Sequence, residues 1–125
     1  MYPLKFHPHL TVARWKKFGL SRNLLMIATE FSRCKNALLR GDEREVKESL
    51  ERAFELLDLT VEIVEKGNLL RELLRFREVM GEFYLKERKE KEEVEKLLKT
   101  LVSLNKEAFN ALYPPEQGKT QEPHP

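Results

Sequence analysis

The sequence has few of the residues on which cross-links and metal sites depend. Among its 125 residues there is one cysteine, Cys34, which excludes an intrachain disulfide and any metal site built from several cysteines. No uninterrupted apolar run is long enough to cross a membrane, and the first residues lack the long apolar centre of a secretory signal. We therefore expect a reduced, cytoplasmic protein without a membrane partner, in which Cys34 is a buried structural thiol.

Catalytic motifs are equally scarce. The three histidines, His7, His9 and His124, fall outside the predicted core, so the long predicted helices offer no Glu-x-x-His pair for a di-iron site. His7 and His9 have no neighbouring carboxylate or cysteine to complete a metal site, which favours a solvated terminus. Five scattered glycines form no phosphate-binding loop, and no Gly-x-Ser-x-Gly elbow is present. The sequence therefore predicts no catalytic residues, no metal and no cofactor.

Charge is abundant and unevenly distributed. Charged residues make up 35% of the chain, a densely charged composition that fits a protein from a hot environment. Residues 1–40 hold eight Lys or Arg and one acid, Glu30, a balance of +7; residues 41–125 hold fifteen Lys or Arg and twenty acids, a balance of −5. Two explanations remain open: the basic segment binds an anionic partner, or it docks on the acidic remainder of the same molecule.

Apolar residues recur at steps of three and four, which is the helical period. They predict long helices over about 22–40, 43–66 and 69–86 and around 94–102, with short helices over 10–17 and after Asn105. The expected N-caps are Ser21, Asp42, Asn68 and Asn105, and the expected stops are Gly41 and Gly67. The charged run 86–95 contains no Gly or Pro, so a continuous helix and a turn both remain open.

These elements predict an all-α fold, an up-and-down four-helix bundle with short helices at both ends. One bundle domain is expected over 1–113, with an extended segment over 1–9. Residues 114–125 are polar and rich in proline, which indicates a disordered tail. No segment alternates with period two, so we expect no sheet.

Two charged residues, Lys35 and Glu72, occupy positions where helical spacing places apolar ones. Lys35 follows Phe31 by four residues, and Glu72 precedes Phe76 by four. Because a lone buried charge is costly, each residue either reaches solvent at the rim of the core or finds a partner. The second option underlies an alternative function, an enzyme or small-ligand-binding bundle with a polar site near Lys35 and Glu72.

Two helices carry a second apolar row beside their core row. A helix with two apolar sides is central in a bundle or contacts a second chain. The sequence therefore predicts a homo-oligomer, or a protein partner, whose interface contains Leu56, Leu59, Ile63, Leu70 and Leu74.

Lys or Arg residues alternate with aromatic residues near the start of the chain. The positive charges of Lys and Arg attract phosphates, and exposed aromatic rings stack on nucleobases. The residues predicted to bind nucleic acid are Arg14, Trp15, Lys16, Lys17 and Arg22, with Trp15 as the stacking group. The alternative is that Trp15 and Phe18 close the end of the bundle core.

The stretches 51–60 (ERAFELLDLT) and 71–84 (RELLRFREVMGEFY) resemble small uncharacterised helical proteins of hyperthermophiles. That group has no known activity, so the resemblance implies nothing about function. In size and helix count the chain also resembles HEPN-type bundles, which accompany small nucleotidyltransferases or act as ribonucleases. The ribonuclease members carry an Arg-x4–6-His motif, and no Arg here is followed by His at that spacing.

Together these features predict a non-catalytic interaction module that self-associates and serves in a nucleic-acid-linked complex.

Overall fold

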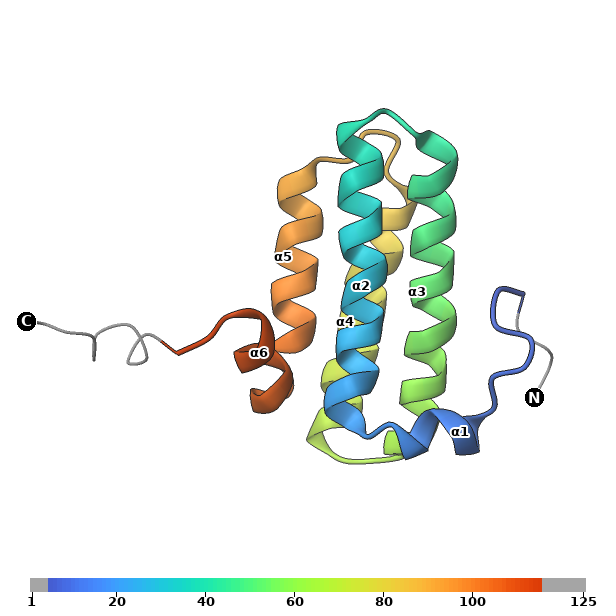
Figure 1. Cartoon of the computed structure of the whole chain (residues 1–125), viewed down its shortest axis with the longest axis vertical. Helices are drawn as coiled ribbons and strands as arrows, with labels where there is room; N and C mark the ends of the chain where they lie inside the picture. The colour runs from blue at the N-terminus through green and yellow to red at the C-terminus, as the bar shows by residue number, and fades with distance from the viewer. Residues whose placement is uncertain (1–4, 116–125) are drawn as a thin grey trace, which may run out of the picture.

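Six α-helices and no strand make up residues 5–115, the part of the chain that the computed structural model describes (Figure 1). In chain order they are α1 (Val12–Lys17), α2 (Leu20–Leu39), α3 (Glu43–Val64), α4 (Asn68–Leu85), α5 (Lys91–Val102) and α6 (Lys106–Leu112). The all-helical class predicted from the apolar period is confirmed. The predicted tail from residue 116 onward, with His124, and the first four residues of the predicted extended segment lie outside the described residues.

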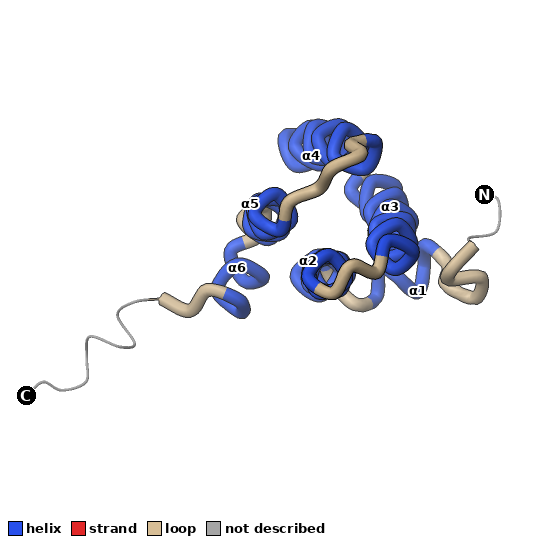
Figure 2. Tube along the Cα trace, turned by 90° about the horizontal axis from the view of Figure 1, so that it is seen from above, coloured by secondary structure: helices blue, strands red, loops and turns tan. Residues whose placement is uncertain are grey.

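The four longer helices run side by side around a common core (Figure 2). α2 packs most extensively against α3 and, on its other side, against α5, while α4 packs against α3. Contact between α4 and α5 is the sparsest among these neighbours. Phe31 on α2 and Phe76 on α4 meet edge to face with 6.0 Å between their ring centroids. The core is therefore continuous from α2 to α4, and α4 is held mainly by α3.

Each long helix contributes a buried apolar row at the predicted spacing. The rows are Leu24, Ile27, Phe31 and Cys34 on α2; Val46, Leu50, Ala53 and Leu57 on α3; Leu73, Phe76, Met80 and Phe83 on α4; and Val94, Leu97 and Leu101 on α5. Complete burial of one large apolar side chain stabilises the fold by about 1.5–3 kcal/mol. The rows fix which side of each helix faces inward, and thereby which side is left for partners.

Several helix ends follow the predicted caps. Gly41 closes α2 with a positive φ of 74°, a conformation that glycine adopts without strain. Asp42 caps α3, because its side chain accepts a 3.1 Å hydrogen bond from the Glu45 backbone N–H. Asn105 caps α6 in the same way by accepting a 2.9 Å hydrogen bond from the Ala108 backbone N–H.

Two predicted N-caps are wrong by one or two residues. Ser21 lies inside α2, whose N-cap is Gly19, and Asn68 is the first residue of α4, whose N-cap is Gly67. Both glycines have a positive φ, 87° and 99°, which lets the chain turn sharply into the next helix. The preference of Ser and Asn for caps was therefore overridden by the conformational freedom of the neighbouring glycine.

The charged run 86–95 contains a turn. α4 ends at Leu85, α5 begins at Lys91, and residues 86–90 connect them without helix. The Lys86 ammonium pairs with the Glu93 carboxylate across this connection and lowers the pKa of Glu93. Of the two alternatives that the sequence left open, the turn is the one adopted.

The two short helices lie at the same end of the long ones (Figure 1). α1 packs mainly on α3, whereas α6 packs against α2 and α5. No helix in the described part is both long enough and apolar enough to cross a lipid bilayer.

Candidate interaction surfaces

Trp15, predicted as the stacking group for nucleobases, is fully buried. Its indole N–H donates a 2.9 Å hydrogen bond to Oγ1 of Thr60 on α3. Asn23 on α2 donates through Nδ2 to the Trp15 carbonyl oxygen, also at 2.9 Å. The predicted stacking role of Trp15 is therefore wrong. The alternative holds instead: Trp15 closes the end of the core and fastens α1 to α2 and α3.

The other four residues predicted to bind nucleic acid, Arg14, Lys16, Lys17 and Arg22, are exposed on α1 and the first turn of α2. We refer to this group of four exposed cations on α1 and the start of α2 as the basic face. None of the four forms an ion pair with an acid among the described residues. Phe18 lies between them in the chain and is 37% exposed, with the Arg22 guanidinium 5.9 Å from its ring centroid. The four cations are therefore exposed and have no acidic partner among the described residues, although the Arg14 guanidinium donates a 3.4 Å hydrogen bond to the His9 carbonyl oxygen. Phe18, unlike Trp15, is exposed.

The two explanations for the charge asymmetry apply to different parts of the basic segment. Lys35 on α2 pairs with Glu95 on α5 at 2.5 Å, which lowers the pKa of the Glu95 carboxyl. Arg40 lies 3.5 Å from an oxygen of Asp42. In the last part of residues 1–40, positive charges are thus paired with acids of the same chain. The cations of the basic face form no such ion pairs.

The predicted oligomer interface is not one exposed surface. Leu56 and Leu59 are 3% and 1% exposed, and Ile63 is half-buried. α1 packs on α3 in this part of the helix, where Trp15 donates a hydrogen bond to Thr60. Leu70 is half-buried, and only Leu74, at 45%, is well exposed. The expectation that Leu56 and Leu59 are open to a partner is therefore wrong. Leu56 and Leu59 belong to the hydrophobic core of the same chain, and Ile63 packs against that core.

A different apolar surface is open between α4 and α5. This α4–α5 groove has a volume of about 460 Å³. Its apolar lining consists of Phe76, Val79, Phe83, Leu97 and Leu104. Val79 is 48% exposed, whereas Phe76 and Phe83 beside it are each only 4% exposed. The groove arises where the contact between neighbouring long helices is sparsest.

Lys35 and Glu72, the residues of the alternative ligand site, do not face a common cleft. Lys35 is half-buried and lines a separate hollow between α2 and α5, where it pairs with Glu95. Glu72 is exposed on α4 and lines the α4–α5 groove. Each residue lines a different concave surface, so the two cannot be combined into one polar site.

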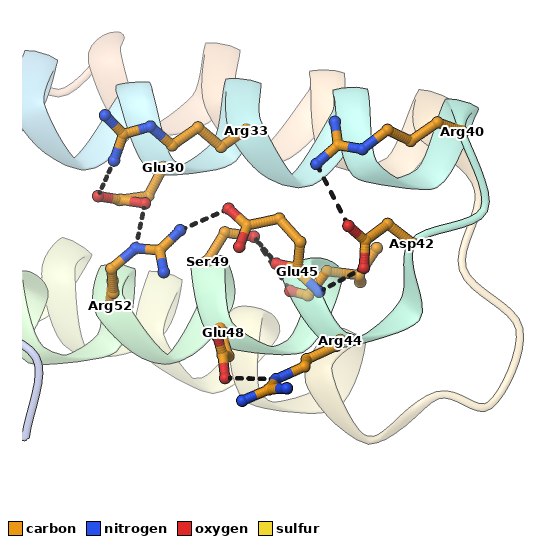
Figure 3. A network of polar contacts seen from close by, with 10 residues as sticks. Glu30, Arg33, Arg40, Asp42, Arg44, Glu45, Glu48, Ser49 and Arg52 are labelled. Carbon is orange, nitrogen blue, oxygen red and sulfur yellow. Dashed lines mark hydrogen bonds and ion pairs between the residues drawn. The ribbon is translucent and has the colours of Figure 1, made fainter.

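A largely buried ion-pair network joins α2 to α3 (Figure 3). Glu30 on α2 is 5% exposed, and its two carboxylate oxygens contact Nε of Arg52 at 2.9 Å and a terminal nitrogen of Arg33 at 3.0 Å. Arg52 on α3 reaches Glu45 as well, at 2.7 Å. The Arg52 guanidinium thus bridges two carboxylates, which compensates for removing these charges from water.

Sequence reasoning missed this network, although a signal was present. Glu30 follows Ile27 by three residues and precedes Cys34 by four, the same kind of spacing that singled out Lys35. Helical spacing alone does not show which residue of another helix is opposite, so Arg52 had no visible connection to Glu30.

Two titratable groups near the core keep their protons at neutral pH. Burial raises the pKa of the Cys34 thiol to about 11, so Cys34 is a buried structural thiol and no nucleophile. The hydroxyl of Tyr84 on α4 donates a 2.6 Å hydrogen bond to Oε2 of Glu51 on α3, which raises the pKa of Tyr84 to about 12. Neither group is prepared for acid–base or nucleophilic chemistry.

The segment before α1 is fastened to α3 by Glu55. The Glu55 carboxylate accepts hydrogen bonds from the backbone N–H groups of Lys5, at 2.7 Å, and Phe6, at 3.0 Å. Nδ1 of His7 lies 2.9 Å from the other carboxylate oxygen. His7 is thus partly buried and engaged, and the expectation of a solvated terminus holds for His9 and not for His7.

Within residues 5–115 no three His, Cys, Asp or Glu side chains gather into a group that could hold a metal ion. Comparisons of the chain with protein-family models, with curated proteins and with solved structures found no match. The basic face and the α4–α5 groove are two surfaces that are open to a partner.

Proposed function

We propose that the protein is a non-catalytic interaction module that self-associates through its α4–α5 groove. The observation that carries this proposal is the exposure of Val79, which is 48%, on the apolar lining of the groove. Val79 follows Phe76 by three residues and precedes Phe83 by four, so the three side chains share one side of α4. An apolar helix face beside a groove is a typical docking place for a helix of another chain.

The charges around the groove favour a second copy as the partner. The charged residues that line it are Glu72, Arg75, Glu82, Lys86, Glu93 and Lys96. Acids and bases occur here in equal number, so the rim has no net charge. In a two-fold symmetric dimer the same surface meets itself, and a rim of balanced charge avoids the repulsion that a rim of one sign would cause.

We also propose the finer architecture expected from the sequence, an up-and-down four-helix bundle formed by α2 to α5. It is supported by the packing of α2 on α3, α3 on α4, and α2 on α5, and by the short connections at Gly41 and Gly67. In this arrangement α4 and α5 pack least closely and leave the groove open on one side of the bundle. A second copy of the chain would cover this side. A reducing, cytoplasmic location remains part of the proposal.

Sedimentation equilibrium of the full chain tests self-association. The wild-type protein should show a mass above the 14.8 kDa of one chain at high micromolar concentration. Val79→Glu should return the mass to that of one chain, because it places a carboxylate in the apolar contact. A wild-type protein that stays at the mass of one chain would overturn the proposal.

Leu74→Glu is the matched control for Val79→Glu. Leu74 is on the same helix and is equally exposed, at 45%, but it does not line the groove. We expect this variant to associate like the wild type. Dissociation by Leu74→Glu and not by Val79→Glu would assign the interface to the side of α4 that the sequence analysis favoured.

A second candidate function is the binding of a small amphipathic ligand in the same groove. Its volume of about 460 Å³ falls within the range of small-molecule sites, and Glu72 supplies a polar group at its edge. This function requires a chain that remains monomeric and binds an apolar fluorescent probe, such as anilinonaphthalene sulfonate, at one site that Val79→Glu abolishes. Probe binding that is indifferent to Val79→Glu would exclude it.

A further inference from the structure

We infer that the basic face binds single-stranded nucleic acid, through phosphate contacts of its four cations and base stacking on the Phe18–Arg22 pair. This surface is separate from the α4–α5 groove: α1 packs on α3, whereas the groove lies between α4 and α5 (Figure 2). The inference therefore stands independently of the proposed self-association.

The sequence around the basic face contains no acid. From residue 5 to residue 29 there are five Lys or Arg and no Asp or Glu. The next residue, Glu30, is buried and paired with Arg33 and Arg52, so it does not offset the charge of this surface. A compact group of cations without intervening acids is the electrostatic signature of a phosphate-binding surface.

Acids from the neighbouring helix do not neutralise these cations by direct pairing. Glu62 and Glu65 stand at the end of α3 next to α1 and are exposed. Neither forms an ion pair with a described residue. In contrast, Lys35 and Arg40, farther along α2, are paired with acids. Within residues 5–40, the cations without an ion pair thus precede Arg33 in the chain, and they include all four of the basic face.

Phe18 and Arg22 provide a place where unpaired nucleobases can stack, which charge alone does not provide. The Phe18 ring is 37% exposed, and its edge-to-face contact with Trp15, with centroids 5.9 Å apart, fixes its position. The Arg22 guanidinium lies 5.9 Å from the ring centroid. Unpaired bases stack on aromatic rings and on guanidinium planes, so this pair offers a stacking element among the phosphate-binding cations.

The attachment of α1 favours a single strand over a duplex or a membrane. α1 has only six residues and lies against α3, with Trp15 hydrogen-bonded to Thr60, so it cannot enter a major groove as a recognition helix. The same contact turns its largest apolar residue inward, away from any lipid surface. A strand of unpaired nucleotides can instead follow the exposed side of α1 toward Phe18.

The anchored position of α1 also lowers the entropic cost of binding. Hydrogen bonds from Trp15 to Thr60 and from Asn23 to Trp15 hold α1 to two long helices. The cations are therefore displayed from a fixed backbone, and only their side chains need to be ordered on binding.

Fluorescence anisotropy with a labelled single-stranded RNA of mixed sequence tests the inference on the full chain. Contact of four phosphates predicts a salt slope of about −2.8, so affinity should fall about 50-fold between about 50 and about 200 mM salt. Lys16→Glu combined with Lys17→Glu should weaken binding at least about tenfold at low salt, because it removes two phosphate contacts and adds repulsion.

The matched control combines Lys91→Glu with Lys106→Glu. Both lysines are exposed, at the starts of α5 and α6, and the control changes the net charge by the same amount. We expect it to bind the RNA nearly as well as the wild type. Equal loss in the two double variants would mean that net charge and not the basic face drives binding, which overturns the inference.

Phe18→Leu separates stacking from charge. It keeps an apolar side chain against Trp15, and circular dichroism should show unchanged helicity. Affinity for the single strand should fall about fivefold or more with an unchanged salt slope. No binding to single-stranded RNA or DNA at low salt would refute the inference. So would duplex binding as tight as single-strand binding and insensitive to Phe18→Leu, or binding to anionic vesicles in preference to nucleic acid.

Discussion

Glu30 on α2 and Arg52 on α3 form an ion pair with 2.9 Å between their nearest atoms, and both side chains are mostly shielded from solvent, at 6% and 17% exposure. The pair connects the two helices that have the most extensive mutual contact in the molecule. Arg33 and Glu45 complete the hydrogen bonding of the two charges. The only acid in the first forty residues is thus used to hold the fold together and is not available to a partner.

Removing one member of this pair should destabilise the protein strongly. Glu30→Gln removes one of the two carboxylates that Arg52 contacts and the one that Arg33 contacts, so we expect the free energy of unfolding to fall by about 3 kcal/mol. Guanidinium denaturation followed by circular dichroism measures the change. Arg44→Gln, which breaks the exposed Arg44–Glu48 pair, is the control and should alter stability by less than about 1 kcal/mol. A similar loss in both variants would contradict the structural role of Glu30.

Trp15 is the one tryptophan of the chain and reports directly on the attachment of α1. Its emission should be blue-shifted relative to the unfolded protein and insensitive to acrylamide, because the side chain is fully buried. Thr60→Val removes the acceptor of the indole N–H and should reduce stability by about 1–2 kcal/mol. Strong acrylamide quenching of the folded protein would show that α1 is not packed as described.

The helices were predictable because each long one repeats its apolar residues at the helical period, and that period depends on local sequence alone. The end of α2 at Gly41 and the start of α3 at Asp42 were predictable as well, because capping depends on only a few neighbouring residues. The first residues of α2 and α4 could not be identified from the sequence. Ser21 and Asn68 are typical caps, but Gly19 and Gly67 adopt the positive φ found at the actual N-caps.

The candidate sites were less predictable because they depend on which helices become neighbours. The row with Leu59 looked open to a partner in the sequence, whereas the assembled helices bury Leu56 and Leu59 in the core of the same chain. Conversely, Val79 carries no special signal in the sequence. It is exposed because α4 and α5 make sparse contact, which is a property of the assembled helices.

Glu55 should control the position of the segment before α1. Glu55→Ala removes the acceptor for the backbone N–H groups of Lys5 and Phe6, so their amide hydrogens should lose protection and trypsin should cleave faster after Lys5. Hydrogen exchange measured by NMR follows both amides. Glu62→Ala, an exposed acid on the same helix, is the control and should leave them protected. Unchanged exchange in Glu55→Ala would show that other contacts hold the segment.

Stability should fall in alkaline solution as Cys34 and Tyr84 titrate. Burial raises the pKa of Cys34 from 9.0 to about 11, and the hydrogen bond to Glu51 raises the pKa of Tyr84 from 10.0 to about 12. Each raised pKa means that the unfolded chain releases its proton at lower pH than the folded chain does. The stability that each group contributes is therefore complete below its unfolded pKa and is lost as the pH rises toward its folded pKa.

For these two groups the loss should begin near pH 9, with Cys34, and end near pH 12, with Tyr84. Denaturation midpoints measured across this range, each relative to the value of the same variant at about pH 8, report the slope. Cys34→Ala should remove the lower part of the fall and Tyr84→Phe the upper part. If Tyr84→Phe kept the full alkaline fall, the hydrogen bond to Glu51 would not be what holds the proton on Tyr84.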